Sequence, residues 1–126
     1  MAKSFKIQAA PTFSAKVSIP RVGGDFLEVP FTFKVMGRKE LAKLYSGWGK
    51  EYKDLFEKHD GEITEAYAVE EVALQVKQIK EIVVSWGFED QFNDENLEEL
   101  VDTVVSVTDA ITSTYNEGYS KARRGN

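Results

Sequence analysis

The sequence predicts an α+β protein in which an N-terminal β-hairpin precedes a predominantly α-helical bundle of four to five helices. Two observations carry this prediction. Apolar and polar residues alternate as far as Val35, and from Gly37 onward the apolar residues recur at helical spacing. The chain has 126 residues, which suits one ordinary domain. We therefore expect a single domain over residues 1–126, with the hairpin region in 1–36 and the helical region in 37–126.

The hairpin is predicted from two alternating runs joined by a glycine-containing loop. The apolar side of the first run is Phe13, Ala15, Val17 and Ile19, and that of the second is Leu27, Val29, Phe31, Phe33 and Val35. Gly23 and Gly24 permit positive φ in the connection. Pro30 has no N–H to donate, so we expect an unpaired or bulged position there. Phe5 and Ile7 are either a third short strand or an unpaired chain start.

The helical region starts with a stripe that contains Leu41, Leu44, Tyr45 and Trp48, and Gly47 with Gly49 predicts a break in it. The strongest helix is predicted over residues 64–86. Its apolar face, which we expect to be core, is Val69, Val72, Ala73, Val76, Ile79, Val83 and Trp86.

Two more helices follow. Asn93 is a predicted N-cap, with Asp94 and Glu95 in the first turn, where the helix dipole favours anions. Residues 108–124 are predicted as the last helix.

Residues that could carry chemistry are few. There is no cysteine, which excludes disulfides, thiolate metal sites and cysteine nucleophiles. The single histidine, His59, precedes Asp60-Gly61, and we interpret it as a solvent-exposed turn residue rather than a ligand or a base. The acidic set Glu95, Glu98, Glu99 and Asp102 is read as a solvated helix face rather than a cation site, because calcium needs a looped array of oxygens. Without a glycine-rich phosphate loop either, we expect no enzyme, no cofactor and no metal.

Charge is distributed unevenly within a formal net charge of −5. Residues 1–59 carry +5, residues 60–102 carry −11 and residues 103–126 carry +1. The basic part has no dense Lys/Arg run, so we expect solvated faces and no nucleic-acid partner. Opposed charges also favour head-to-tail association, and we expect a homo-oligomer. Because neither a signal-peptide pattern nor a membrane-length apolar run is present, we expect a cytoplasmic protein without a membrane partner.

Aromatic residues are the best candidates for protein contacts. Trp48 and Trp86 fall on apolar stripes, where the default role is core and a partner-binding anchor is the alternative. Tyr115 and Tyr119 are predicted to be exposed on the last helix, an element easily offered to a groove. With Leu41, the predicted partner-binding residues are Leu41, Trp48, Tyr115 and Tyr119.

A resemblance to a known family is carried by the order of five short segments. They are Phe31-Thr32-Phe33-Lys34, Gly37-Arg38-Lys39-Glu40-Leu41, Ser85-Trp86-Gly87-Phe88, Phe92-Asn93-Asp94-Glu95-Asn96-Leu97 and Ala122-Arg123-Arg124-Gly125-Asn126. Over nearly the whole chain the sequence resembles the tail assembly chaperones of long-tailed bacteriophages. Asn93 stands where such proteins commonly have Ser or Thr, a conservative change because Asn also caps helices, and Gly37 replaces a better capping residue.

The resemblance implies a role in tail morphogenesis. Such a chaperone coats the tape measure protein, keeps it soluble and hands it to the tail tube protein. It acts in the host cell cytoplasm, is absent from the mature virion, and is made in part as a longer frameshifted product. Two alternatives stay open: a structural tail subunit, such as a terminator or tube-related protein, and a small phage-encoded inhibitor of a host protein.

Overall fold

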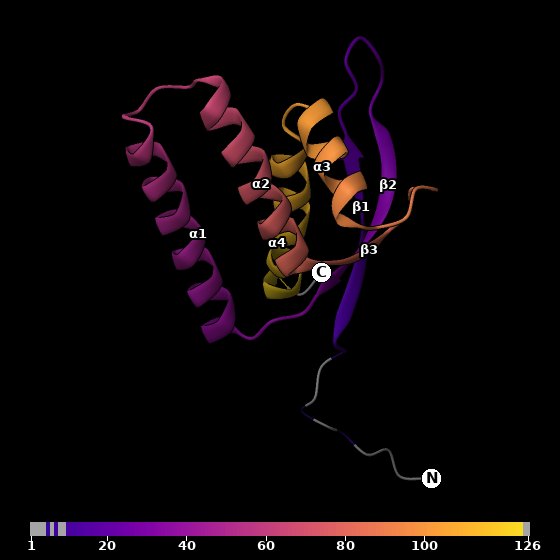
Figure 1. The fold of residues 1–126 in the computed structure, drawn as a ribbon. Helices are drawn as coiled ribbons and strands as arrows, with labels where there is room; N and C mark the ends of the chain where they lie inside the picture. Colours follow the sequence, from indigo (N-terminus) through magenta and orange to yellow (C-terminus); the bar gives the residue numbers. More distant parts are fainter. Residues whose placement is uncertain (1–4, 6, 8–9, 125–126) are drawn as a thin grey trace.

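The computed structural model describes Phe5, Ile7 and residues 10–124, and it confirms the α+β class with four helices (Figure 1). In chain order the elements are β1 (Thr12–Ile19), β2 (Leu27–Lys34), α1 (Arg38–Lys58), α2 (Glu65–Ile82), β3 (Val83–Trp86), α3 (Asp94–Thr103) and α4 (Val107–Arg124). The N-terminal hairpin is confirmed, with β1 and β2 antiparallel from Thr12 opposite Lys34 to Ile19 opposite Leu27. Gly23 adopts the positive φ of 69° that was expected in the connection.

The third strand does not come from the chain start. Phe5 and Ile7 lie outside the strands and are exposed, whereas β3 pairs antiparallel with β2 and gives the strand order β1-β2-β3. The prediction of one helix over residues 64–86 was therefore wrong at its end. The helix stops at Ile82, and Val83 and Trp86, whose spacing also suits a helix, lie instead opposite Phe33 and Phe31.

The prediction of an unpaired or bulged position at Pro30 was wrong for the hairpin. It lies opposite Lys16 in an unbroken β1–β2 register, and its carbonyl accepts a hydrogen bond from Gly87 N at 2.8 Å. A strand can hold proline where no ladder hydrogen bond needs its nitrogen. The irregularity of the sheet lies two residues further on, between Thr32 and Phe33, on the β3 side.

The helix ends follow the local sequence, with one exception. Asn93 caps α3, because its side chain accepts a hydrogen bond from Asn96 N at 2.9 Å, and Thr64 caps α2 through Tyr67 N. Gly37 stands before α1 without a side-chain cap. The predicted break at Gly47 and Gly49 is absent from α1, since a glycine costs only about 1 kcal/mol in a helix that tertiary packing supports.

The helices lie on one side of the sheet, and α1 lies farthest from it (Figure 1). The fully buried side chains come from the inward face of the sheet and from α2, α3 and α4; they include Val17, Phe31, Phe33, Ile79, Ile82, Leu97, Ile111 and Tyr115. In α1 only Leu55 is buried, and it is 9% exposed. The core is thus shared by the sheet and three helices, and α1 is added on its outside.

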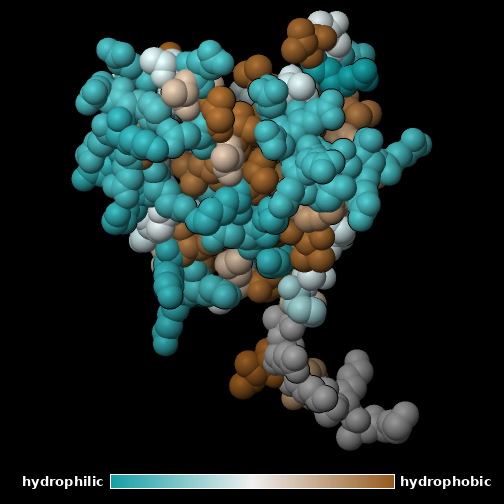
Figure 2. All heavy atoms as spheres, viewed as in Figure 1, coloured by the Kyte–Doolittle hydropathy of each residue, from teal (hydrophilic) through white to brown (hydrophobic). Residues whose placement is uncertain are grey.

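Two residues of α2 that were predicted to lie in the core are exposed. Val69 is 66% exposed and Ala73 is exposed as well, because the core-facing stripe of α2 runs through Val72, Val76 and Ile79 instead. Figure 2 shows apolar side chains over the middle of this face, framed by hydrophilic ones. The acidic set of α3 is exposed, as its interpretation as a solvated face requires. Over the described part of the chain, no helix is both long and apolar enough to cross a membrane.

Candidate functional site

The candidate site is a cleft between α1 and α4, floored by α2, which we call the α1–α4 cleft. It has a volume of about 360 Å³. Its lining residues are Tyr45, Trp48, Gly49 and Tyr52 from α1, Gln78 from α2, and Thr108, Asp109, Thr112 and Asn116 from α4. Concave sites of this size are typical places for a ligand or a partner side chain.

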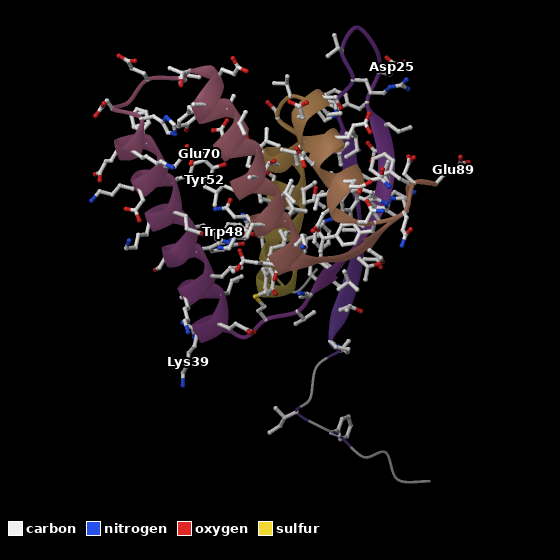
Figure 3. The ribbon with its side chains drawn as sticks, in the orientation of Figure 1. Asp25, Lys39, Trp48, Tyr52, Glu70 and Glu89 are labelled. Atoms are coloured by element: carbon white, nitrogen blue, oxygen red, sulfur yellow. The ribbon has the colours of Figure 1, made fainter. Side chains whose placement is uncertain are left out.

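The α1 wall of the cleft is aromatic. Tyr45, Trp48 and Tyr52 follow one another at spacings of three and four residues, which places them on the same helix face. The rings of Tyr45 and Trp48 meet edge to face with centroids 5.4 Å apart. Figure 3 shows Trp48 and Tyr52 projecting from α1 toward α2, whereas Lys39 points into solvent. Aromatic side chains of this kind dominate the binding energy of protein interfaces.

Hydrogen bonds, beside the packing of Leu41, Leu44 and Trp48 against the core, connect α1 to the rest of the protein around the cleft. The Trp48 indole N–H donates to Glu81 Oε1 at 3.1 Å, and Gln75 Nε2 donates to the Tyr52 hydroxyl at 2.8 Å. The Tyr45 hydroxyl donates to Asn116 Oδ1 on α4. Burial raises the pKa of both tyrosine hydroxyls, so they stay protonated at neutral pH.

The floor of the cleft contains an unsatisfied polar group. Gln78 is only 3% exposed, and its Nε2 has no hydrogen-bond partner among the described residues. Its neighbour one turn earlier, Gln75, is hydrogen-bonded at both polar atoms, because it donates to Tyr52 and its Oε1 accepts from the Thr108 hydroxyl at 2.7 Å. A buried donor without an acceptor costs about 1–3 kcal/mol. Such a group in a native protein calls for an explanation.

The end of α1 is closed by a charged cluster at the turn into α2. Glu70 of α2 pairs with both Lys58 and His59, and the side chain of His59 is only 14% exposed. The interpretation of His59 as a solvent-exposed turn residue was therefore wrong. The short turn at Asp60-Gly61, where both residues have positive φ, folds α2 back so that Glu70 reaches the imidazole. The cluster holds α1 and α2 together at the C-terminal end of α1, opposite the end where Gly37 lies.

The four predicted partner-binding residues lie in different surroundings. Trp48 lines the cleft, and Leu41 is half-buried against the core further along α1. The prediction that Tyr115 is exposed was wrong: it is 0% exposed and donates to Lys34 O at 2.8 Å. Tyr119 is half-buried and accepts from Met36 N at 2.8 Å. The face of α4 that holds Ile111 and Tyr115 covers the sheet, so Tyr115 and Tyr119 lie against the hairpin and the segment that follows it.

Sequence reasoning missed Tyr52 and Gln78 as site residues. A signal for the glutamines existed: Gln75 and Gln78 lie three residues apart within the stretch that holds the apolar stripe of α2. Polar residues within such a stripe indicate a polar contact inside the fold. Their common location beside α4, however, depends on tertiary packing that no local pattern reveals.

The fold and the cleft define a class of protein: a small α+β protein whose outer helix forms the aromatic wall of a surface cleft. Comparison with known families is more specific. The chain belongs to a phage tail assembly chaperone family, whose model matches residues 1–126, the whole chain. It is therefore a chaperone of tail assembly, as the resemblance implied, and its partners are tail proteins. Neither the curated proteins nor the solved structures contain a match.

Proposed function

We propose that this chaperone binds the tape measure protein, keeps it soluble and recruits tail tube subunits while the tail is assembled. The observation that carries the proposal is the match to the tail assembly chaperone family over residues 1–126. A tape measure protein is a long helical chain, and apolar stripes left bare on such a chain promote aggregation. A small protein with an aromatic wall and a strongly charged exterior suits the task of covering them.

The contact surface proposed for the tape measure protein is the α1 side of the molecule, with Trp48 at its centre. Trp48 lies in the cleft, and Leu55 is the one residue of α1 in the buried class. Leu41 extends the same helix toward its N-terminus. Tyr115 and Tyr119 support this surface indirectly, by holding α4 in place.

Co-expression with the tape measure protein of the same phage tests the proposal. A tagged chaperone should retain the tape measure protein in the soluble fraction and co-elute with it. The Trp48→Ala variant should lower the recovered amount at least several-fold, because hot-spot aromatic residues carry much of the binding energy. Val22→Ala, at an exposed position in the hairpin loop, is the matched control. A tape measure protein that is soluble alone and never co-elutes would contradict the proposal.

We further propose that the protein works without catalysis, in the host cell cytoplasm, and leaves before the virion is complete. A chaperone role needs reversible binding rather than bond chemistry. Mass spectrometry of purified virions should detect the tube protein but not this chain, while lysates collected before tail completion should contain it.

Self-association is also proposed, since coating a long chain requires many copies. Two features support it: the uneven charge along the sequence, and the outer edge of β1, which no other described strand covers. Light scattering over a range of concentrations should show a mass that rises above the 14.2 kDa monomer.

A further inference from the structure

We propose that two copies of the protein pair through the free edge of β1, antiparallel and in a register centred on Ala15, so that their two three-stranded sheets become one. The inference rests on the self-association put forward under the proposed function, and it adds the contact surface and the register. Its starting observation is the strand order β1-β2-β3, in which β1 pairs with β2 alone among the described strands.

The backbone groups that face the free edge follow from the alternation of an antiparallel pair. Val35 N donates to Pro11 O at 2.9 Å, so the odd-numbered residues of β1 direct their N–H and C=O groups toward β2. The even-numbered residues direct theirs away from it; they are Thr12, Ser14, Lys16 and Ser18. Among the described residues, no turn, loop or cap hydrogen bond between backbone groups involves these four positions. They are therefore available to a further strand.

The free edge lacks most of the features that prevent strands from pairing. β1 pairs with β2 over its full length of eight residues without a shift, because the irregularity of the sheet lies on the β3 side. The strand contains neither proline nor glycine, and its one charged residue is Lys16. A lysine on an edge strand opposes pairing where like charges meet. It therefore restricts the registers that a second copy can adopt.

The position of Lys16 favours one register over its neighbour. Opposite side chains of an antiparallel pair lie on the same face of the sheet, so a two-fold axis passes through a pair of identical residues. With the axis at Ala15, Lys16 lies opposite the neutral Ser14 of the second copy, and all four outward-facing residues are paired. With the axis at Lys16, two lysines meet, and Thr12 faces Pro20, which has no N–H. A further shift in either direction pairs fewer residues of β1.

A groove beside the free edge gives room for α4 of the second copy. The groove has a volume of about 790 Å³ and lies between Phe13 and Ala15 of β1 and the outer side of α4. An axis perpendicular to the sheet places both α4 helices on the same side of it, so each helix closes the groove of the other copy. The α4 side of the groove includes the small residues Ser113, Thr114 and Gly118, which permit a close approach of two helices.

A second copy is the occupant that matches both features. Its β1 supplies donors and acceptors in the required alternation, and its α4 covers the groove at the same time. An extended peptide on its own pairs with the edge but leaves the groove open.

The first experiment is cross-linking through single introduced cysteines, which has no background because the chain contains no cysteine. In the proposed register Ala15 faces Ala15 of the second copy in a non-hydrogen-bonded pair, with Cα atoms about 4.5 Å apart. This separation suits a disulfide. Mild oxidation of Ala15→Cys should therefore give a covalent dimer of twice 14.2 kDa on a denaturing gel.

Lys16→Cys is the matched control, one residue further along and more exposed. In the proposed register its two Cα atoms lie on a diagonal about 7–8 Å apart, which is too far for a disulfide. It should therefore remain largely monomeric on the gel. Cross-linking of Lys16→Cys in place of Ala15→Cys, equal cross-linking of both, or none of either would overturn the inference.

The second experiment removes one outward-facing donor. Lys16→Pro should leave the β1–β2 ladder intact, because the nitrogen of this residue faces away from β2. Two hydrogen bonds of the dimer are lost by symmetry, so its dissociation constant, measured by analytical ultracentrifugation, should rise about tenfold or more. Lys16→Thr removes the same charge but keeps the N–H, and it should dimerise at least as tightly as the wild type. Equal dissociation constants for the two variants would overturn the inference. Circular dichroism checks that Lys16→Pro is folded, and cross-linking decides if it is not.

The possible failures can be told apart. If the wild type is monomeric at every concentration, the proposed self-association fails together with this inference, while co-expression tests the binding of the tape measure protein separately. If the wild type associates and Ala15→Cys does not cross-link, the copies meet at another surface. The inference then fails and the proposed function stands.

Discussion

At the scale of single residues, two tyrosine hydroxyl groups bind α4 to the end of β2 and the segment that follows it. Tyr115 donates to Lys34 O at 2.8 Å, Tyr119 accepts from Met36 N at 2.8 Å, and the two oxygens are 3.0 Å apart. Burial is the largest cause of a raised pKa at Tyr115, followed by its hydrogen bond to Tyr119. The Tyr115 hydroxyl therefore remains a proton donor throughout the pH range in which proteins are usually studied.

Removing one hydroxyl should have a measurable effect on stability. Tyr115→Phe removes the hydrogen bond to the Lys34 carbonyl, and we expect a loss of about 0.5–1.5 kcal/mol in the free energy of unfolding, measured by urea denaturation. Tyr119→Phe should cost less, because that side chain is only half-buried. Equal stability of wild type and Tyr115→Phe would show that the pair does not fasten α4.

At the scale of elements, the contact of α4 with β1 depends on a residue without a side chain. A Cβ at Gly118 would lie 2.6 Å from the Phe13 ring, which stacks on Tyr115. Gly118→Ala should therefore lower stability by about 1–3 kcal/mol, as overpacking does. Gly47→Ala is the matched control, since nothing lies within 4 Å of its Cβ position. There we expect a gain of about 0.5–1 kcal/mol from helix propensity. Thermal unfolding of both variants checks the opposite signs.

The charged cluster between α1 and α2 predicts a sensitivity to acid. The hydrogen bond from Lys58 and then that from His59 lower the pKa of Glu70 below its ordinary value of 4.5. A carboxyl whose pKa is lower in the folded state contributes stability above its unfolded pKa, and this contribution is lost as pH falls through the folded pKa. The α1–α2 hairpin should therefore loosen below about pH 4.5.

NMR signals of the Trp48 indole, recorded from neutral pH downward, measure this loosening. In Glu70→Gln the acid-induced change should be reduced and α1 should already be less protected from hydrogen exchange at neutral pH. Glu98→Gln, on the exposed face of α3, is the control and should behave as the wild type. An unchanged acid response in Glu70→Gln would assign the transition to other carboxyl groups.

Local patterns predicted most elements because each has its own period or cap. The hairpin, the Asn93 cap and the last helix follow from a few neighbouring residues. β3 does not, because Val83 and Trp86 satisfy helical spacing equally well, and only pairing with Phe33 and Phe31 decides for a strand. That choice depends on a segment some fifty residues away in the chain.

The candidate site was predictable only in part, for a similar reason. The aromatic spacing of α1 pointed to Trp48, but the side of a helix that faces a neighbour cannot be read from the helix alone. The burial of Tyr115 under the sheet and the lack of a partner for Gln78 are both properties of the packed molecule. For such residues an amphipathic pattern predicts contact, and tertiary structure decides whether the contact is with the core or with a partner.

At the scale of the whole molecule, the basic and acidic parts of the sequence form different helices and strands. The hairpin and α1 fall within the +5 part of the chain, and α2, β3 and α3 fall within the −11 part. Head-to-tail contacts between unlike parts of two copies continue from copy to copy where their rotation does not close a ring, which would suit the proposed coating of a long chain. The exposed carboxylates of α3 are the acidic half of the proposed contact.

Such contacts should weaken when salt screens them. Raising the ionic strength from about 0.05 M to about 0.5 M shortens the Debye length severalfold, so the mass measured by light scattering should fall toward 14.2 kDa. Glu98→Lys with Asp102→Lys should give the same fall at low salt, because both side chains are exposed on α3. The exposed pair Glu98→Gln with Asp102→Asn should have an intermediate effect, since it removes charge without reversing it. A mass that does not depend on salt would assign association to apolar contacts, and a monomer under all conditions would rule out self-association.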